Sequence, residues 1–224
     1  SKVTIVKPNT FTPDNIKNNV EIGGVVGNCT SLKELLETGK SHSAAYLFYG
    51  SGASSVDNII NYSDTEHVYN FSYMFAKCPF LTSVPLLAMS GSNQISLGNM
   101  FDGCKALSTI PLFDTQYVVY MQYMFNECTN FTTMPLLNTS KVRNMEHMFQ
   151  SCSSLTTIPL LDTSNVSTMD YMFYGCSKLT TIPLLNTSKV TRMFATFAGC
   201  TSLTTIPSLN TSNVKFMEKM FYEC

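Results

Sequence analysis

Cysteine recurs at an interval of 24 residues from position 104 to the end of this 224-residue chain. The stretch that ends at Cys176, residues 156–176, has near-copies before and after it. A fixed period of 20–50 residues is the signature of a solenoid, in which each repeat packs only against its neighbours. The chain is therefore expected to form a stack of similar units rather than a single globular core. The cysteines that mark the period are Cys104, Cys128, Cys152, Cys176, Cys200 and Cys224.

The first half of each unit predicts a short parallel strand. Residues 155–161 read Leu-Thr-Thr-Ile-Pro-Leu-Leu, and the Thr-Thr-Ile segment favours β-structure. Leu155, Ile158 and Leu160 have the spacing of a leucine-rich repeat, Leu-x-x-Leu-x-Leu. Pro159 removes a backbone donor, which limits the predicted ladder to about three residues before a polyproline-like exit.

The second half of each unit predicts a short helix. Thr163 or Ser164 offers a side-chain oxygen that could cap its first turn. Apolar residues then recur at steps of three and four, which is typical of one face of a helix. The neighbouring units repeat this pattern. In this unit the apolar residues are Val166, Met169, Met172, Phe173 and Cys176.

One short strand and one short helix cannot bury their own apolar side, but stacked copies can. The predicted fold is an α/β solenoid, a right-handed leucine-rich-repeat-like stack of short parallel strands and short helices. About seven to eight units at the usual strand spacing would span roughly 35–40 Å. Residues 74–224 form regular repeats and residues 25–73 degenerate ones, with Ser51 at a cysteine position. Residues 1–24 do not match and are predicted to be a strand-and-loop cap, the alternative being a disordered leader.

The repeated motif resembles a known family. Its pattern is Met-Phe-x-x-Cys-x-x-Leu-Thr-Thr-Ile-Pro-Leu-Leu-(Asp/Asn)-Thr-Ser-x-Val, which is similar to the BspA-like leucine-rich repeat of bacterial surface proteins. The resemblance is strong over residues 74–224 and weak over 25–73, and it implies surface exposure, adhesion and protein binding. Thr196 departs from the motif by replacing Met. The chain stops at Cys224 in mid-repeat, so the natural chain is expected to continue.

Composition argues against several kinds of partner. Charged residues make up 13% of the chain and the net charge is -1, with no cluster of Lys and Arg. Nucleic acid and anionic membrane surfaces are therefore disfavoured. No run of about 18 apolar residues predicts a membrane span, and the first residues lack the apolar region of a signal peptide.

The cysteines are predicted to be buried free thiols that pack as small apolar groups. No short Cys-x-x-Cys spacing indicates a metal site, although disulfides between stacked neighbours remain an alternative. Asp114 and Asp162 alternate with Asn at the same repeat position, which predicts turn formation and helix capping rather than a calcium row.

No catalytic constellation can be assembled from the sequence. The three histidines, His42, His67 and His147, lie at unrelated repeat positions, and no nucleophile–His–carboxylate set or phosphate-binding loop is present. The chain is therefore predicted not to be an enzyme and to need no cofactor.

Two kinds of repeated side chain are candidates for an interaction face. Threonines form rows one repeat apart, and adjacent threonines of a strand are expected to point to opposite sides. Tyrosines and one histidine share a position on the exposed side of the predicted helix, and exposed Tyr is common at interfaces. The candidate residues are Thr109, Thr133, Thr157, Thr181, Thr205, Tyr73, Tyr123, His147 and Tyr171.

The function predicted from these features is recognition or adhesion outside the cell, by binding a protein or glycan along an extended repeat face. The alternative is a structural subunit of a fibre, filament or virion that self-assembles through its repeats. The predicted location is extracellular or on the cell surface, with a virion left open.

Overall fold

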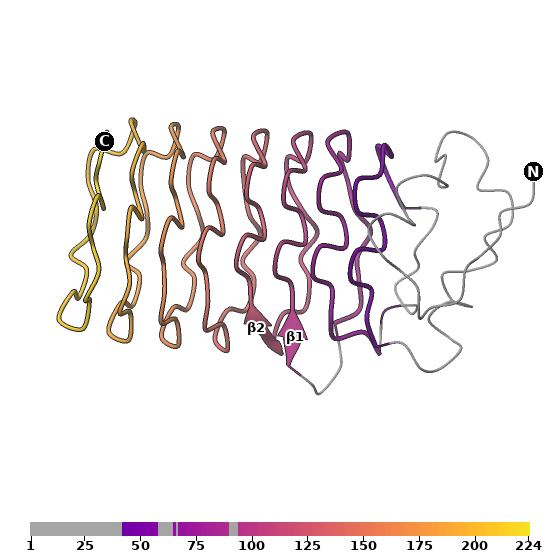
Figure 1. The fold of residues 1–224 in the computed structure, drawn as a ribbon, viewed down its shortest axis with the longest axis horizontal. Coiled ribbons are helices and arrows are strands. Elements are labelled where there is room, and N and C mark those ends of the chain that lie inside the picture. Colours follow the sequence, from indigo (N-terminus) through magenta and orange to yellow (C-terminus); the bar gives the residue numbers. More distant parts are fainter. Residues whose placement is uncertain (1–41, 58–64, 66, 90–93) are drawn as a thin grey trace, which may run out of the picture.

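The chain forms a stack of similar turns, seen in a computed structural model that describes residues 42–57, 65, 67–89 and 94–224. The turns lie side by side along the long axis of the molecule and end at the C-terminus (Figure 1). The predicted repeat solenoid is therefore confirmed. The proposed cap, residues 1–24, and the first degenerate unit lie outside the described residues.

Regular strand structure is confined to one narrow ladder. Strands β1 (Ile95–Ser96) and β2 (Val118–Tyr120) pair in parallel, with Ile95 opposite Val118. Single parallel bridges continue this ladder from Asn144 to Thr168 and on to Arg192. These positions precede the Met-Phe motif, so the prediction of a ladder at residues 156–158 is wrong.

Residues 155–161 have a period of three rather than two. Leu155, Ile158 and Leu161 are buried, whereas Leu160 is 62% exposed. A repeat of three is the period of polyproline II, which suits a segment whose Pro159 lacks a backbone donor. The Leu-x-x-Leu-x-Leu spacing therefore does not describe the buried residues, because Leu161 and not Leu160 is the third of them.

The predicted helix is also wrong, because no α-helix occurs among the described residues. The segment forms consecutive tight turns, in which Met172 N–H donates to Met169 O at 3.1 Å and Tyr174 N–H donates to Tyr171 O at 3.0 Å. The alternate amide groups point along the stack: Tyr171 N–H donates to Phe194 O of the next turn at 2.9 Å. Backbone hydrogen bonds thus join residues within each turn and also join each turn to the next.

Left-handed backbone residues make this alternation possible. Tyr171 has φ 56° and Gly175 has φ 70°, and the equivalent positions of the other described turns repeat the pattern. Such angles are unfavourable for most residues and easy for glycine. The Cys-preceding glycines Gly103, Gly175 and Gly199 are therefore a signal against a helix.

The interior is built from side chains that stack on their equivalents in the neighbouring turns. Phe149 and Phe173 stack with centroids 5.6 Å apart and planes 8° apart. The cysteines from Cys78 to Cys200 lie beside this stack as buried free thiols, which confirms the packing role predicted for them. The stacked phenylalanines are Phe48, Phe75, Phe101, Phe125, Phe149, Phe173, Phe197 and Phe221.

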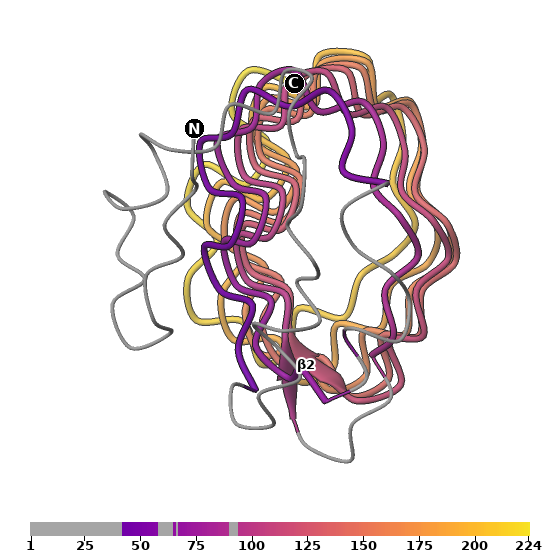
Figure 2. The ribbon, with the colours of Figure 1, turned by 90° about the vertical axis from the view of Figure 1, so that its right-hand side faces the viewer.

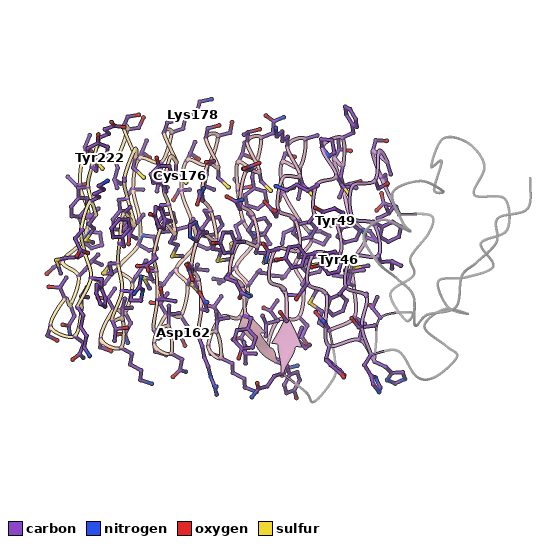
Figure 3. All side chains as sticks on the ribbon, in the orientation of Figure 1. Tyr46, Tyr49, Asp162, Cys176, Lys178 and Tyr222 are labelled. Atoms are coloured by element: carbon purple, nitrogen blue, oxygen red, sulfur yellow. The ribbon has the colours of Figure 1, made fainter. Side chains whose placement is uncertain are left out.

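Each turn has two walls around this interior (Figure 2). Cys176 and Lys178 lie near one end of the turn and Asp162 near the other (Figure 3). Residues 155–161 and their equivalents form one wall, here called the leucine wall. Residues 167–176 and their equivalents form the opposite wall, here called the turn wall.

Candidate functional site

The leucine wall carries a row of exposed leucines, one per turn. Each follows the recurring proline, at a position where the period of three directs the side chain outward. The adjoining residue, Leu161 in this unit, already fills the core. The outer leucine therefore adds little to packing within the stack. The row comprises Leu86, which is 45% exposed, and Leu112, Leu136, Leu160 and Leu184, which are 61–62% exposed.

Threonines flank this row. Thr156 and Thr157 are both exposed, so the prediction that adjacent threonines point to opposite sides is wrong. The period of three places two consecutive residues outward. Thr180 Oγ1 donates to Thr156 O at 3.2 Å, which ties neighbouring turns together. The predicted row Thr109, Thr133, Thr157, Thr181 and Thr205 is exposed throughout.

The leucine wall carries no charged residue. Its segments contain only Leu, Ile, Val, Met, Phe, Pro, Ser and Thr, so the outer face combines aliphatic side chains with hydroxyl groups. A regular uncharged surface of this kind differs from an ordinary solvated protein surface, which is rich in charge. The segments are residues 81–87, 107–113, 131–137, 155–161, 179–185 and 203–209.

The aromatic candidates lie on the turn wall. His147 stacks between Tyr123, at 4.2 Å between centroids, and Tyr171, at 4.5 Å. Tyr73 stacks on Tyr46 at 4.7 Å. All five side chains are half-buried and stand on left-handed backbone. The predicted aromatic and threonine rows therefore belong to opposite walls and do not form one face.

Ion pairs also occur on the turn wall. The Asp102 carboxylate lies 3.1 Å from Lys77 Nζ and accepts a hydrogen bond from Asn126 Nδ2 at 2.8 Å. Burial alone would lower the pKa of Lys77, but the hydrogen bond and charge of Asp102 outweigh it and raise this pKa. Asp170 is buried and lies 2.6 Å from Arg192 Nε.

Turn formation by Asp and Asn is confirmed at the end of the leucine wall. Asp162 Oδ1 accepts from Ser164 N at 2.9 Å; the hydrogen bond of the Ser164 side chain first, and this backbone bond second, lower the pKa of Asp162. Thr163 is not a helix cap; its buried hydroxyl donates to Asn186 O of the next turn at 2.9 Å.

The described part of the chain contains no group of three or more His, Cys, Asp or Glu side chains arranged to hold a metal ion. Within the same residues no helix is long and apolar enough to cross a membrane.

The exposed leucine row was not predicted from the sequence, because Leu160 fitted the Leu-x-x-Leu-x-Leu spacing. One sequence signal identifies it as a surface position: Ser208 replaces leucine in the last copy, whereas the adjoining Leu209 retains it. A core position would not tolerate this change easily.

The fold defines the class of protein as a leucine-rich-repeat solenoid. The leucine-rich repeat protein of T. pallidum has a TM-score of 0.50 and 21% identity, over 72% of this chain and 70% of that one. A leucine-rich repeat protein of Eubacterium ventriosum has a TM-score of 0.41 and 20% identity, over 64% of this chain and 43% of that one. A leucine rich cell surface protein of Faecalibacterium prausnitzii has a TM-score of 0.31 and 20% identity, over 66% and 59%.

The chain belongs to the family described as "Mycoplasma protein of unknown function, DUF285", which matches residues 42–158, 95–202 and 154–224. The resemblance to BspA-like repeats is thereby confirmed. No curated protein matches the chain.

Proposed function

We propose that this chain is a non-enzymatic recognition module on the bacterial cell surface that binds a protein through the leucine wall. The observation that carries the proposal is the row of exposed leucines, Leu112 to Leu184, which protrude from an uncharged wall at a regular interval. Extended apolar rows on a soluble surface are typical of protein-binding faces.

A protein partner is favoured over a glycan because of the chemistry of this wall. Glycan recognition relies on polar groups and accessible aromatic faces, and the outer positions of the leucine wall carry neither charge nor an aromatic ring beyond Phe80 at its edge. Leucine and threonine instead match the apolar and hydroxyl groups of a protein surface. The repeated spacing suits a partner that contacts several turns at once.

We also place the chain outside the cell, which agrees with this proposal. The cell-surface description of the Faecalibacterium protein belongs to that protein, and the sequence motif resembles surface-exposed repeats. A long exposed row also fits adhesion, in which several weak contacts add along one face.

The test is binding of the purified chain to an immobilised panel of extracellular matrix proteins, with a panel of glycans in parallel. The variant Leu136→Asp/Leu160→Asp places two charges in the row without touching the core. Binding to at least one protein of the panel is expected, with a loss of about tenfold or more in the variant.

A matched control is Ser154→Asp/Lys178→Asp, which adds charge at the end of the turns rather than on the wall. This control is expected to bind as the native chain does. Failure of the native chain to bind any protein, equal binding by the leucine variant, or exclusive binding of glycans would contradict the proposal. Large assemblies of the chain alone in sedimentation velocity would also contradict it.

A further inference from the structure

The row of stacked rings on the turn wall is interrupted at Asn99. Tyr73 N–H donates to Gly98 O and Asn99 N–H donates to Gln122 O, at 3.1 and 2.9 Å, so the turn that carries Asn99 lies between those of Tyr73 and Tyr123. Asn99 has the same left-handed backbone as its aromatic neighbours. One ring face of Tyr73 and one of Tyr123 are therefore directed toward a position that holds only a short amide.

The stack itself is regular through this interruption. Phe75, Phe101 and Phe125 stack at 5.6 Å in both steps. Two strand spacings then place the rings of Tyr73 and Tyr123 about 9–10 Å apart. The Asn99 side chain reaches no further than the base of a tyrosine ring, so the outer parts of both rings lack a stacked partner from that turn.

The same wall shows what occupies an equivalent position elsewhere. His147, a planar group that can carry positive charge, lies between Tyr123 and Tyr171 with interplanar angles of 9° and 15°. Its Nε2 is 3.5 Å from Glu146 Oε1. A planar group between Tyr73 and Tyr123 would reproduce this arrangement one turn away.

The electrostatics beside Asn99 favour a cation. Asp102 N–H donates to Asn99 O within one turn, and Asp102 and Glu127 lie 3.1 and 3.7 Å from Lys77 Nζ. Two carboxylates against one ammonium leave this cluster with one net negative charge.

Two further features at and near Tyr123 agree with a negative charge beside the gap. The pKa of Tyr123 is raised first by burial and then by the neighbouring Glu146, Tyr73 and Asp102. Gln122 Oε1 and Asn126 Oδ1, two buried oxygens of the same turn, accept no hydrogen bond within the described residues. Two acceptor oxygens of this turn are therefore unpaired.

We propose that the gap between Tyr73 and Tyr123 over Asn99 is a binding slot for a planar cation, the guanidinium group of an arginine on a partner protein. Guanidinium is planar, always charged and stacks on aromatic faces, whereas an ammonium group fits such a slot less well. The slot is on the wall opposite the leucine row, so it does not depend on the function proposed for that row.

The test uses the full chain with ¹³C-labelled tyrosine and the probe acetyl-Gly-Arg-Gly-amide, followed by NMR. The peptide is expected to shift the ring signals of Tyr73 and Tyr123 saturably and to leave Tyr171 unchanged. Matched peptides with lysine or citrulline are expected to bind about threefold or more weakly.

Two variants fill the slot from within. Asn99→Tyr and Asn99→His place in this turn the residues found at the same position in other turns, so both are expected to fold and to lose the arginine-dependent shifts. Asn130→Tyr adds a ring at an exposed position outside the wall and is expected to bind as the native chain does.

The proposal would be overturned by three results: no arginine-dependent shift at Tyr73 and Tyr123, equal shifts in a slot-filled variant that folds, or equal binding of the citrulline peptide. Loss of partner binding by the leucine-wall variant has no bearing on these readouts, so the two proposals fail separately.

Discussion

The thiol of Cys176 donates a hydrogen bond to the carbonyl oxygen of Phe149 in the preceding turn, with Sγ and O 3.0 Å apart. The same bond joins Cys152 to Phe125 at the same distance. Each cysteine thus fills a corner of the core and gives this carbonyl a second hydrogen bond, because Phe149 O also accepts from Cys152 N–H within its own turn at 3.0 Å. A thiol does both because it is small and apolar yet still a weak donor.

The buried thiols are expected to react slowly in the folded chain. Burial raises the pKa of Cys78 to about 12 and holds the pKa of Cys152 well above its usual range. Only the thiolate is a good nucleophile. In a Cys29→Ser background, one fast-reacting thiol, that of the exposed Cys224, is expected at pH 8, and seven after unfolding in urea. A disulfide reagent with optical readout measures both counts; several fast-reacting thiols in the folded chain would contradict the packing described.

Stability is expected to fall with pH above the ordinary cysteine pKa. The unfolded thiols lose their protons above pH about 8.5, while the buried ones stay protonated until pH approaches 12, as for Cys200. Within that window the unfolded state binds fewer protons, so the free energy of unfolding decreases by about 1.4 kcal/mol per pH unit per thiol.

Urea unfolding between pH 8 and pH 10.5 measures this slope. The double variant Cys152→Ala/Cys176→Ala lacks two of the thiols. Its free energy of unfolding is expected to be lower at pH 8 but to decrease less steeply with pH, by the contribution of two thiols. Because tyrosines titrate in the same range, the difference between the two chains is the relevant quantity. An unchanged slope would show that these thiols do not contribute.

The sequence analysis predicted the repeat, the buried positions Met169, Met172 and Phe173, and the free thiols, but not the backbone that places them. Steps of three and four also result from tandem turns closed by hydrogen bonds between residues three apart, so hydrophobic periodicity alone does not distinguish these turns from a helix. The recurring glycine at Gly175 is a local signal that does, because glycine is unfavourable in a helix and favourable at positive φ.

The interaction surfaces were only partly predictable. Tyr123, His147 and Tyr171 share a repeat position, and their alignment follows from the period itself. The exposure of Leu160 was not predicted, because in units with two adjacent leucines the residue types alone do not indicate which one faces inward, and only Ser208 in the last copy does. That choice depends on the period of three around Pro159, which is a property of backbone conformation rather than of hydrophobicity.

Buried threonines at one repeat position differ in whether their hydroxyl group donates a hydrogen bond. Thr163 Oγ1 donates to Asn186 O at 2.9 Å, whereas the equivalent Thr139 Oγ1, also buried, has no partner in the described part of the chain. Thr163→Val is expected to destabilise the chain by about 1–2 kcal/mol, and Thr139→Val to be nearly neutral. Chemical denaturation measures both, with the exposed Thr157→Val as the control. Equal losses at the two buried sites would refute a hydrogen-bond origin.

The left-handed positions predict the effect of replacing a glycine. Gly175 has φ 70° and a Cβ there would meet nothing closer than 3.7 Å, so backbone strain is the dominant cost of a side chain. Gly175→Ser is expected to lower the free energy of unfolding by about 1 kcal/mol. Gly52→Ser is the matched control, because a Cβ at Gly52 meets no atom within 4 Å and its φ lies outside the left-handed range. A smaller loss at Gly175 than at Gly52 would contradict the assignment of strain.

Asp170 joins two turns of the turn wall, and its loss is expected to weaken that junction. Its side chain is 4% exposed, and Oδ1 accepts from Phe194 N at 2.7 Å while Oδ2 pairs with Arg192. Asp170→Ala removes the acceptor of the Phe194 amide and is expected to cost about 1–3 kcal/mol. Asp170→Asn keeps an acceptor at that amide and is expected to cost less, since the charge on the exposed Arg192 remains hydrated. Glu218→Ala, at the exposed equivalent position two turns later, is the control and should change the urea midpoint little. If the asparagine variant is as unstable as the alanine variant, the ion pair rather than the backbone hydrogen bond holds the turns together.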